Sequence, residues 1–495
     1  MKELYSYKGE NIGSSLKENN ELFAQIFAND AVFRTRDIIS ANNVKFECTL
    51  MFMDGMINTM LLNESIIEPL IIADADNTTE SLVDYIKKQV LFANEIKETS
   101  DIFDMLSGLL YGDTVLLIDT SDTALVINTK GWRTRGITEP SDERVMQGPR
   151  EGFDEALMLN LAMLRRKLPT PDLSVEFLRC GRKTDTKMFL CYIGSLVNKK
   201  TAQIIKKRIE KIDIDGILDS NYINELINDN RYSMFKTIGS TERPDIVAAR
   251  LLEGRVALMV DGTPVVLTMP YLFVENFQSD DDYYLNFWFA GLGRILRYLC
   301  FFIGTFLPAL YVALTIYNPQ LLPASFLLTV ATSRGGIPFS TLVECITLSV
   351  IFEILKETGI RMQQGVGHAL SIVGGLVVGQ AAVEAKIVSA PLLIVVAFSG
   401  IASLMVPRLK VSVFYYKLFL ILLSSFFGLF GFFTGITLMF IHIYSLKSFG
   451  ADYTSPLEIA TKSSLKDTVI RVPWRSMISR PWSLTKNLRR FRMRK

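Results

Sequence analysis

Histidine and cysteine are scarce in this sequence, and their scarcity argues against most classes of metal site. The chain of 495 residues contains 2 histidines and 5 cysteines. The cysteines form no CxxC pair, and no second type of ligand clusters beside them. We therefore expect no metal site and no zinc enzyme, and we expect the five thiols to be buried structural groups.

The signature motifs of the common nucleotide-dependent and hydrolytic enzymes are also missing. The sequence has no P-loop, no GxSxG elbow, no HExxH pair and no dinucleotide-binding fingerprint. We therefore expect no catalytic residue, no cofactor and no enzymatic activity. The lack of a phosphate-binding loop also argues against a primary pump driven by ATP.

The net charge of +2 is a sum over regions of opposite sign. Residues 1–282 hold about 32 basic and about 44 acidic side chains, whereas residues 447–495 hold about 12 basic and about 3 acidic ones. The first twenty or so residues lack the apolar segment of a signal peptide. We therefore expect the acidic half to be cytoplasmic and the end of the chain to form a basic cytoplasmic tail.

Two sequence patterns recur in the acidic half at an offset of about 140 residues, as in a tandem repeat. KFECTLMFMDGMIN at Lys45–Asn58 recurs as TKMFLCYIGSLVN at Thr186–Asn198, and LLYGDTVLLID at Leu109–Asp119 recurs as LLEGRVALMVD at Leu251–Asp261. The first pattern predicts a strand, a glycine turn and a helix, and the second predicts a β-hairpin. We therefore expect two similar α/β subdomains, residues 38–140 and 141–284, after a polar extension at residues 1–37.

The segments between these patterns complete the expected subdomains. Further helical runs are expected at Thr79–Leu91, Phe153–Leu168 and Lys200–Ile212. Residues 140–150 are rich in charge and include Arg144 and Arg150 beside a Gly-Pro pair. We favour a salt-bridged connector between the subdomains there, with an anion site as the alternative.

Residues 285–446 are expected to form a bundle of transmembrane helices. Leu299–Tyr317 carries no charge for about 19 residues, enough to span a bilayer. Arg294 and Arg297 precede it and place that end in the cytoplasm by the positive-inside rule. Further spans are expected at Ile337–Leu355, Val366–Ala385 and Ile387–Val406. The interrupted stretch 321–339 predicts a re-entrant or interfacial element, and residues 413–446 are either one long tilted helix or two short ones.

Polar residues inside these spans are the candidates for function, because an ionisable group in a membrane is costly. Glu344 and Glu353 are nine positions apart, about 180° around a helix, so we expect them not to form one two-carboxylate site. Gln380 and Glu384 lie near the end of a helix rich in glycine and alanine. Small residues favour close helix packing, which the sequence alone favours here, and they can also form the wall of a pore.

Aromatic and basic side chains alternate in the tail, which contains Trp474, Trp482 and Phe491 among arginines and lysines. This pattern favours binding to anionic membrane lipid rather than to nucleic acid. From the residues alone, a channel, a transporter subunit and a membrane-anchored scaffold all stay open.

Several long segments resemble a known family. They are SDERVMQGPREGFDEAL, YIGSLVN, RPDIVAARLLEGRVALMVDGTPVVLTMPYLF and the stretch from GIPFSTLVEC to SAPLLIVVA. Together they resemble the A subunit of GerA-type spore germinant receptors, from about Ile38 to Ser455. The first residues and the basic tail carry little of the resemblance.

The resemblance implies a multi-pass protein of the spore inner membrane, with its N-terminal domain in the spore core. Its partners would be the B and C receptor subunits, and it would form a homo-oligomer, expected to be a pentamer, that works as a nutrient-gated channel for monovalent cations. A non-conducting scaffold or a secondary-transporter subunit is the alternative. The pore-lining candidates that follow from this resemblance are Ile372, Gly375, Val378, Gly379, Gln380, Ala382 and Glu384.

Overall fold

A computed structural model of the chain divides into two compact units. The structure describes residues 4–40, 46–73, 81–131, 139–140, 143, 145–361, 379–455, 467–485 and 487–490. The first unit comprises Met1–Asp229, Ile238–Pro270 and Ser479–Lys495, and the second comprises Asn230–Thr237 and Tyr271–Ile478. The border at residue 270 therefore precedes the boundary expected at residue 284, and the expected tail at residues 447–495 is shared between the units.

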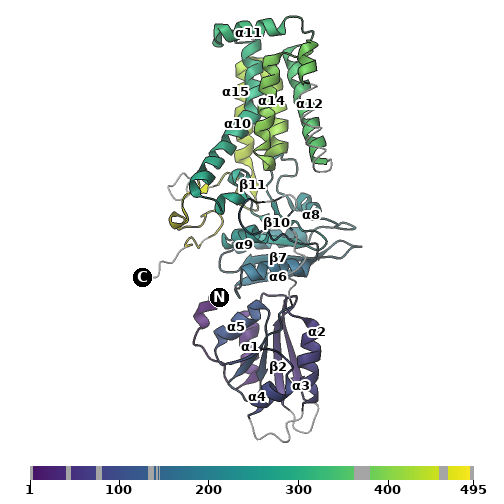
Figure 1. The fold of residues 1–495 in the computed structure, drawn as a ribbon, viewed down its shortest axis with the longest axis vertical. Coiled ribbons are helices and arrows are strands. Elements are labelled where there is room, and N and C mark those ends of the chain that lie inside the picture. The colour runs from purple at the N-terminus through teal and green to yellow at the C-terminus, as the bar shows by residue number, and fades with distance from the viewer. Residues whose placement is uncertain are drawn as a thin grey trace. The chain divides into compact units, whose positions relative to one another are not determined.

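The first subdomain is a five-stranded antiparallel sheet with helices on both faces (Figure 1). Its strand order is β1-β2-β4-β5-β3. Alternate residues of β2 and β4 point to opposite faces: Met51 and Leu117 face α1 and α5, while Leu50 and Leu116 face α2, α3 and the segment 82–90. The elements are α1 (Leu16–Ile26), β1 (Phe33–Ile39), β2 (Glu47–Met53), α2 (Thr59–Leu62), α3 (Glu68–Ile72), α4 (Leu82–Tyr85), β3 (Ile96–Thr99), α5 (Ile102–Tyr111), β4 (Thr114–Ile118) and β5 (Ala124–Ile127).

The second subdomain repeats this topology. Its strand order, β6-β7-β9-β10-β8, matches the first when the strands are taken in chain order. The elements are α6 (Leu157–Lys167), β6 (Leu173–Cys180), β7 (Thr186–Ile193), α7 (Lys199–Ile209), α8 (Ser220–Ile227), β8 (Gly239–Thr241), α9 (Pro244–Leu252), β9 (Val256–Val260) and β10 (Val266–Met269). The two repeated sequence patterns fall on β2 with β7 and on the hairpins β4–β5 and β9–β10.

Matched residues do the same local work in both copies. Asn58 and Asn198 cap α2 and α7, each accepting hydrogen bonds from backbone N–H groups of the first helical turn. Gly112 and Gly254 follow α5 and α9 with φ of 94° and 90°, a left-handed conformation that glycine adopts without a Cβ penalty. The repeated pattern thus encodes a cap at one helix start and a stop at another helix end.

The N-terminal residues are part of the first subdomain, which differs from the expected polar extension at residues 1–37. Phe23 of α1 is fully buried, and Ile26 and Phe27 join the same core. β1 begins at Phe33, before the boundary set at residue 38. Because α1 buries apolar side chains against the sheet, this segment contributes to the stability of the subdomain.

The second unit is built on helices. They are α10 (Phe287–Ile316), α11 (Ala324–Arg334), α12 (Thr341–Arg361), α14 (Ala390–Leu404) and α15 (Lys410–Ser445), with residues 379–384 also helical. Within the described part of the chain, Phe287–Ile316 and Pro407–Ser445 are the two helices long and apolar enough to cross a membrane. In the interrupted stretch, α11 has 11 residues, too few to span a bilayer of about 30 Å.

The longest helix reverses direction near its middle. Gly428 has φ 59° and ψ −140°, outside the helical region. A Cβ placed on Gly435 would lie 2.6 Å from a methyl of Leu420, whereas a straight helix separates residues fifteen apart by about 22 Å. Of the two expected alternatives, the structure therefore has two short antiparallel helices joined at Gly428.

Candidate functional site

The pore-lining candidates are only partly covered by the structure. Ile372, Gly375 and Val378 lie outside the described residues. Gly379, Gln380, Ala382 and Glu384 lie in the helical segment 379–384. Gln380 and Glu384 are both exposed, and the Gln380 amide nitrogen donates to the Glu384 carboxylate at 3.0 Å, across one helical turn.

The other face of this segment packs against the helices. Ala382 lies beside the apolar core formed by α10, α12 and α14. A Cβ on Gly379 would lie 3.5 Å from the side chain of Leu393 in α14, an ordinary contact distance. The small residues therefore mediate packing, and the polar pair is left on the surface of the single chain.

Glu344 and Glu353 have different surroundings on α12. Glu344 is 1% exposed, and its Oε2 accepts a hydrogen bond from the Ser389 backbone N–H at 3.0 Å. Glu353 is half-buried and forms an ion pair with Lys356 at 2.6 Å. The two carboxylates thus have separate partners, and among the described residues no group of three or more His, Cys, Asp or Glu side chains is placed to hold a metal.

Buried ion pairs hold the start of α10. Arg294 is fully buried, and it donates to Asp282 at 2.9 Å and to the Asp467 carboxylate at 2.8 Å. Arg297 donates to the other oxygen of Asp282. The Tyr283 hydroxyl donates to Asp467 at 2.9 Å. The two arginines expected as topology markers are therefore neutralised by the buried Asp282 and the partly exposed Asp467, and they fix residue 467 to the base of α10.

The final residues dock onto the first unit through a second set of bonds. The Thr485 hydroxyl is buried and donates to the Leu196 carbonyl. The Arg480 guanidinium donates to the Leu252 carbonyl at 2.6 Å, and Arg490 forms an ion pair with Glu253 at 2.9 Å. These contacts occupy two of the cations on which the expectation of lipid binding rests, and that expectation stays a prediction.

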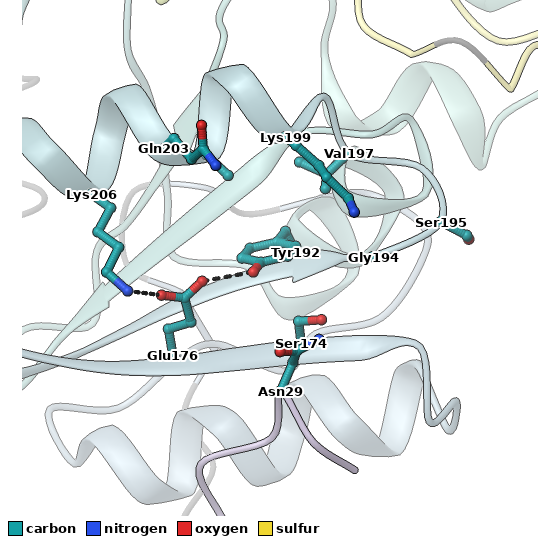
Figure 2. A pocket seen from close by; sticks show the side chains of 11 residues that line it. Asn29, Ser174, Glu176, Tyr192, Gly194, Ser195, Val197, Lys199, Gln203 and Lys206 are labelled. Carbon is teal, nitrogen blue, oxygen red and sulfur yellow. Dashed lines mark hydrogen bonds and ion pairs between the residues drawn. The ribbon is translucent and has the colours of Figure 1, made fainter. Parts of the chain in front are cut away.

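A pocket of about 430 Å³ lies on the second subdomain, over β6, β7 and the start of α7. Glu176 stands between Lys206 and Tyr192 and accepts a hydrogen bond from each (Figure 2). Burial disfavours the Glu176 carboxylate, but the bonds from Lys206 and Tyr192 outweigh it and hold its pKa below the ordinary value. Burial and the Glu176 charge raise the pKa of the Tyr192 phenol. No local sequence motif predicts this group, because Glu176, Tyr192 and Lys206 come from three separate elements.

The cysteines have the environment expected of structural thiols. All five are free, and four of them are buried. Cys48 and Cys191 occupy β2 and β7 of the two sheets, and burial raises the pKa of the Cys191 thiol to about 12. A thiol with such a pKa is protonated and inert at neutral pH.

The carboxylates at the base of α10 and the residues that line the pocket were not singled out from the sequence. Asp282 and Asp467 are among them, and a weak signal for Asp467 exists, because it is one of few acidic residues in a strongly basic tail. Its partner, Arg294, is 173 positions away. No local pattern connects residues so far apart in sequence.

Comparisons with known proteins find similarity over nearly the whole chain. The family model described as Bacillus/Clostridium GerA spore germination protein matches residues 18–483. The chain is 40% identical over 461 residues to spore germination protein KA of Bacillus subtilis (strain 168), covering 93% of this chain and 84% of that protein. It is 37% identical over 486 residues to an uncharacterized membrane protein, YfkQ, of the same organism, covering 97% and 93%.

A solved structure is also similar in sequence. The crystal structure of the N-terminal domain of the A subunit of the Bacillus megaterium spore germinant receptor GerK3 is 31% identical. The match covers 53% of this chain and 98% of that one, with a TM-score of 0.43.

Proposed function

This chain belongs to the Bacillus/Clostridium GerA spore germination protein family, and from that membership we propose that it acts as the A subunit of a spore germinant receptor. The single observation that carries the proposal is its 40% identity to spore germination protein KA over 93% of its length. We further propose that it works with B and C subunits, the partners that the family resemblance implies. The apolar helix Phe287–Ile316 and the apolar stretch Pro407–Ser445, which turns back at Gly428, agree with a receptor in the spore membrane.

We also propose that the second unit assembles around a common axis into a nutrient-gated cation channel. The support is the position of Gln380 and Glu384, which form an exposed polar pair on a segment whose other face packs against α14. A polar pair in a membrane-spanning bundle requires water or polar partners. An aqueous pore between copies of the chain would supply them, with Ile372, Gly375, Val378 and Ala382 as the other pore-lining candidates.

Gating in this proposal is a shift between closed and open assemblies. A nutrient bound to a partner subunit can open the pore only if it binds the open assembly more tightly than the closed one. Moving a closed population from 99% to 1% needs a preference of about 10⁴-fold. We propose that the conformational change caused by nutrient binding reaches the helices through the base of α10. There Arg294 and Arg297 bind Asp282.

Germination of spores tests the receptor role. The chain is produced with its own B and C subunits in a spore former stripped of its other receptors, and the loss of optical refractility is followed after nutrients are added. We expect spores with all three subunits to respond to at least one nutrient, and spores lacking this chain not to respond. Equal responses in both strains would contradict the assignment.

Cation flux tests the channel role. The complex is reconstituted in liposomes loaded with potassium, and efflux is measured with and without nutrient. We expect nutrient-dependent efflux that falls severalfold in Glu384→Ala, because removing the carboxylate lowers the local cation concentration. Gln320→Ala, which changes an exposed amide outside the pore segment, serves as the matched control. A complex that restores germination in spores but never conducts in liposomes would favour a scaffold instead.

A further inference from the structure

Four buried oxygen-bearing side chains lie together where α10, α12 and the start of α14 meet. Thr341 and Glu344 are one turn apart on α12, and Glu344 binds the backbone of Ser389, the residue before α14. Tyr311 of α10 packs in the same cluster as Cys345 and Val388, the chain neighbours of Glu344 and Ser389. All four side chains are at least nine-tenths buried, with exposed fractions of 2%, 1%, 1% and 6% for Thr341, Glu344, Ser389 and Tyr311.

Each of these side chains has an oxygen with no well-formed hydrogen bond among the described residues, although the hydroxyls of Tyr311 and Ser389 lie close enough to interact with each other. The atoms are Oγ1 of Thr341, Oε1 of Glu344, Oγ of Ser389 and the hydroxyl of Tyr311. Arg334 forms an ion pair with Glu344, with 3.8 Å between its Nη2 and Glu344 Oε1, a distance too long for a hydrogen bond. Glu344 is therefore satisfied on one oxygen only, by the Ser389 N–H.

Unpaired oxygens in a buried site cost free energy unless a bound species contacts them. A buried polar atom without a partner costs about 1–3 kcal/mol, and more if it is charged. Buried polar atoms are almost always paired with protein, water or an ion, so four of them in neighbouring positions call for a partner. The grouping therefore indicates a bound species that contacts several oxygens at once.

We propose that these four side chains bind a partly hydrated monovalent cation inside each subunit. Carboxylate and hydroxyl oxygens are the ligands that hard cations prefer. One carboxylate supplies a single negative charge, and no cluster of three or more acidic, Cys or His ligands exists among the described residues, so the site suits a monovalent rather than a divalent ion. The hydroxyls can turn their lone pairs inward, and water completes the coordination.

Arg334 gives the site a competitor. Its side chain is 31% exposed and its guanidinium stands beside the same Oε1 that the cation would use. A cation and Arg334 repel each other at this distance, so removal of the Arg334 charge should tighten cation binding. A site that held only water would not respond in this direction.

The site is separate from the proposed pore. Its ligands are buried within one chain, whereas Gln380 and Glu384 are exposed. Cation binding at equilibrium does not require conduction, and the two proposals therefore fail independently: a chain without flux can still bind cations, and a conducting complex can lack this site.

The test uses the purified full chain in detergent, with thermal unfolding followed in KCl, NaCl or N-methylglucamine chloride at equal ionic strength. A bound ion raises the unfolding midpoint in proportion to the logarithm of its concentration above Kd. We expect the midpoint to rise with potassium or sodium and not with N-methylglucamine, whose cation is too large for the site. Equilibrium dialysis with radioactive rubidium or sodium gives the binding constant directly.

Four variants test which side chains bind the cation. Glu344→Gln should weaken binding by about tenfold or more, because it removes the charge, and tenfold corresponds to about 1.4 kcal/mol. Ser389→Ala, which keeps the backbone N–H to Glu344, should weaken binding less. Arg334→Gln should strengthen it severalfold. Glu353→Gln, on the same helix but paired with Lys356, should leave binding unchanged.

Two results would overturn the proposal. One is a wild-type chain whose midpoint responds equally to all three salts and which retains no radioactive cation, which would mean that the oxygens hold water alone. The other is cation binding that survives Glu344→Gln in a variant with an unchanged elution volume and circular dichroism spectrum, which would place the ion elsewhere.

Discussion

The contribution of a single charged residue to stability depends strongly on its burial. Arg165 of α6 is 1% exposed and pairs with Asp30, itself 3% exposed, in the core that the two subdomains share. Arg182 and Asp213 form a pair of similar chemistry, with both side chains mostly exposed. Water screens the second pair, whereas removal of one partner from the first leaves a buried charge unpaired.

We therefore expect Arg165→Gln to destabilise the first unit by about 3–5 kcal/mol, which lowers its melting temperature by roughly 10 °C. Arg182→Gln, the matched control, should change stability far less, because water screens the exposed pair. Thermal unfolding of the purified full chain measures both. Equal effects of the two substitutions would contradict the role given to the buried pair.

A second prediction at this scale concerns pH. The bonds from Lys206 and Tyr192 hold the pKa of Glu176 below its unfolded value, so Glu176 adds stability above the ordinary glutamate pKa of about 4.3. That contribution is lost as pH falls through the lowered pKa. Wild type and Glu176→Gln should therefore differ at neutral pH and converge as the pH falls below the lowered pKa of Glu176.

The neutral-pH difference should stay below about 1 kcal/mol, because both Glu176 and Lys206 are partly exposed. Glu225→Gln, which changes an exposed carboxyl on α8, is the control and should show no such convergence. Unfolding midpoints measured across the pH range give the stability difference between wild type and Glu176→Gln. A difference that grows in acid would contradict a lowered pKa of Glu176.

Helices and strands are the next scale, and α15 shows how one residue can set the course of a long element. Gly428 combines φ 59° with ψ −140°, a region that essentially only glycine occupies. A Cβ there would also lie 2.9 Å from the side chain of Tyr317. The apolar sequence on both sides of Gly428 is continuous, so the reversal depends on this one position.

We expect Gly428→Ala to destabilise the second unit by about 1–3 kcal/mol, seen as a lower melting temperature and more aggregate on size exclusion in detergent. Gly13→Ala is the control, because Gly13 has open space around its Cβ position and no positive φ. If Gly428→Ala behaved as the control does, the hairpin of α15 would not depend on this residue.

At the scale of the whole molecule, the tail is bonded in both units. Asp467 is fixed to Arg294 in the second unit, and Thr485 and Arg490 are fixed in the first. Each half is held by buried or charged hydrogen bonds, so the described tail is ordered without a lipid surface.

Hydrogen exchange tests this order. We expect slow amide exchange over residues 479–490 in detergent without anionic lipid, because the Arg480 N–H donates to the Leu488 carbonyl and the Thr485 side chain is buried. Thr485→Val removes the bond to Leu196 and should speed exchange in this segment severalfold. Ser476→Ala, in the part of the tail assigned to the second unit, is the comparison. Fast exchange in wild type, slowed only by anionic vesicles, would support a lipid-binding tail instead.

Much of the fold was accessible from sequence because it rests on local patterns. The repeat predicted two subdomains, and Asn58, Asn198, Gly112 and Gly254 do the same work in each copy. The helices near residues 82–90, 157–167 and 199–209 lie within the expected runs to a residue or so. The docking of α1 was missed, because Phe23 and Ile26 stand in a polar context and their burial depends on the distant sheet.

Some residues of the candidate sites were likewise predicted from the sequence, and others were not. Glu344 was predicted from sequence as a costly charge in an apolar span, but its neighbours Thr341, Ser389 and Tyr311 were not, because three separate helical elements bring them together. The pore candidates stay predictions for the same reason. Their role depends on other copies of the chain, whose placement no local pattern encodes.

The sequence by itself determined the duplicated α/β half, the apolar helices and the family, because strand alternation, caps, turns and hydropathy are properties of residues that are neighbours in the chain. Only the tertiary structure decided which charges meet, where α15 turns back and which oxygens share a buried site. Those features depend on contacts between residues far apart in sequence, and such contacts form only when the whole chain packs.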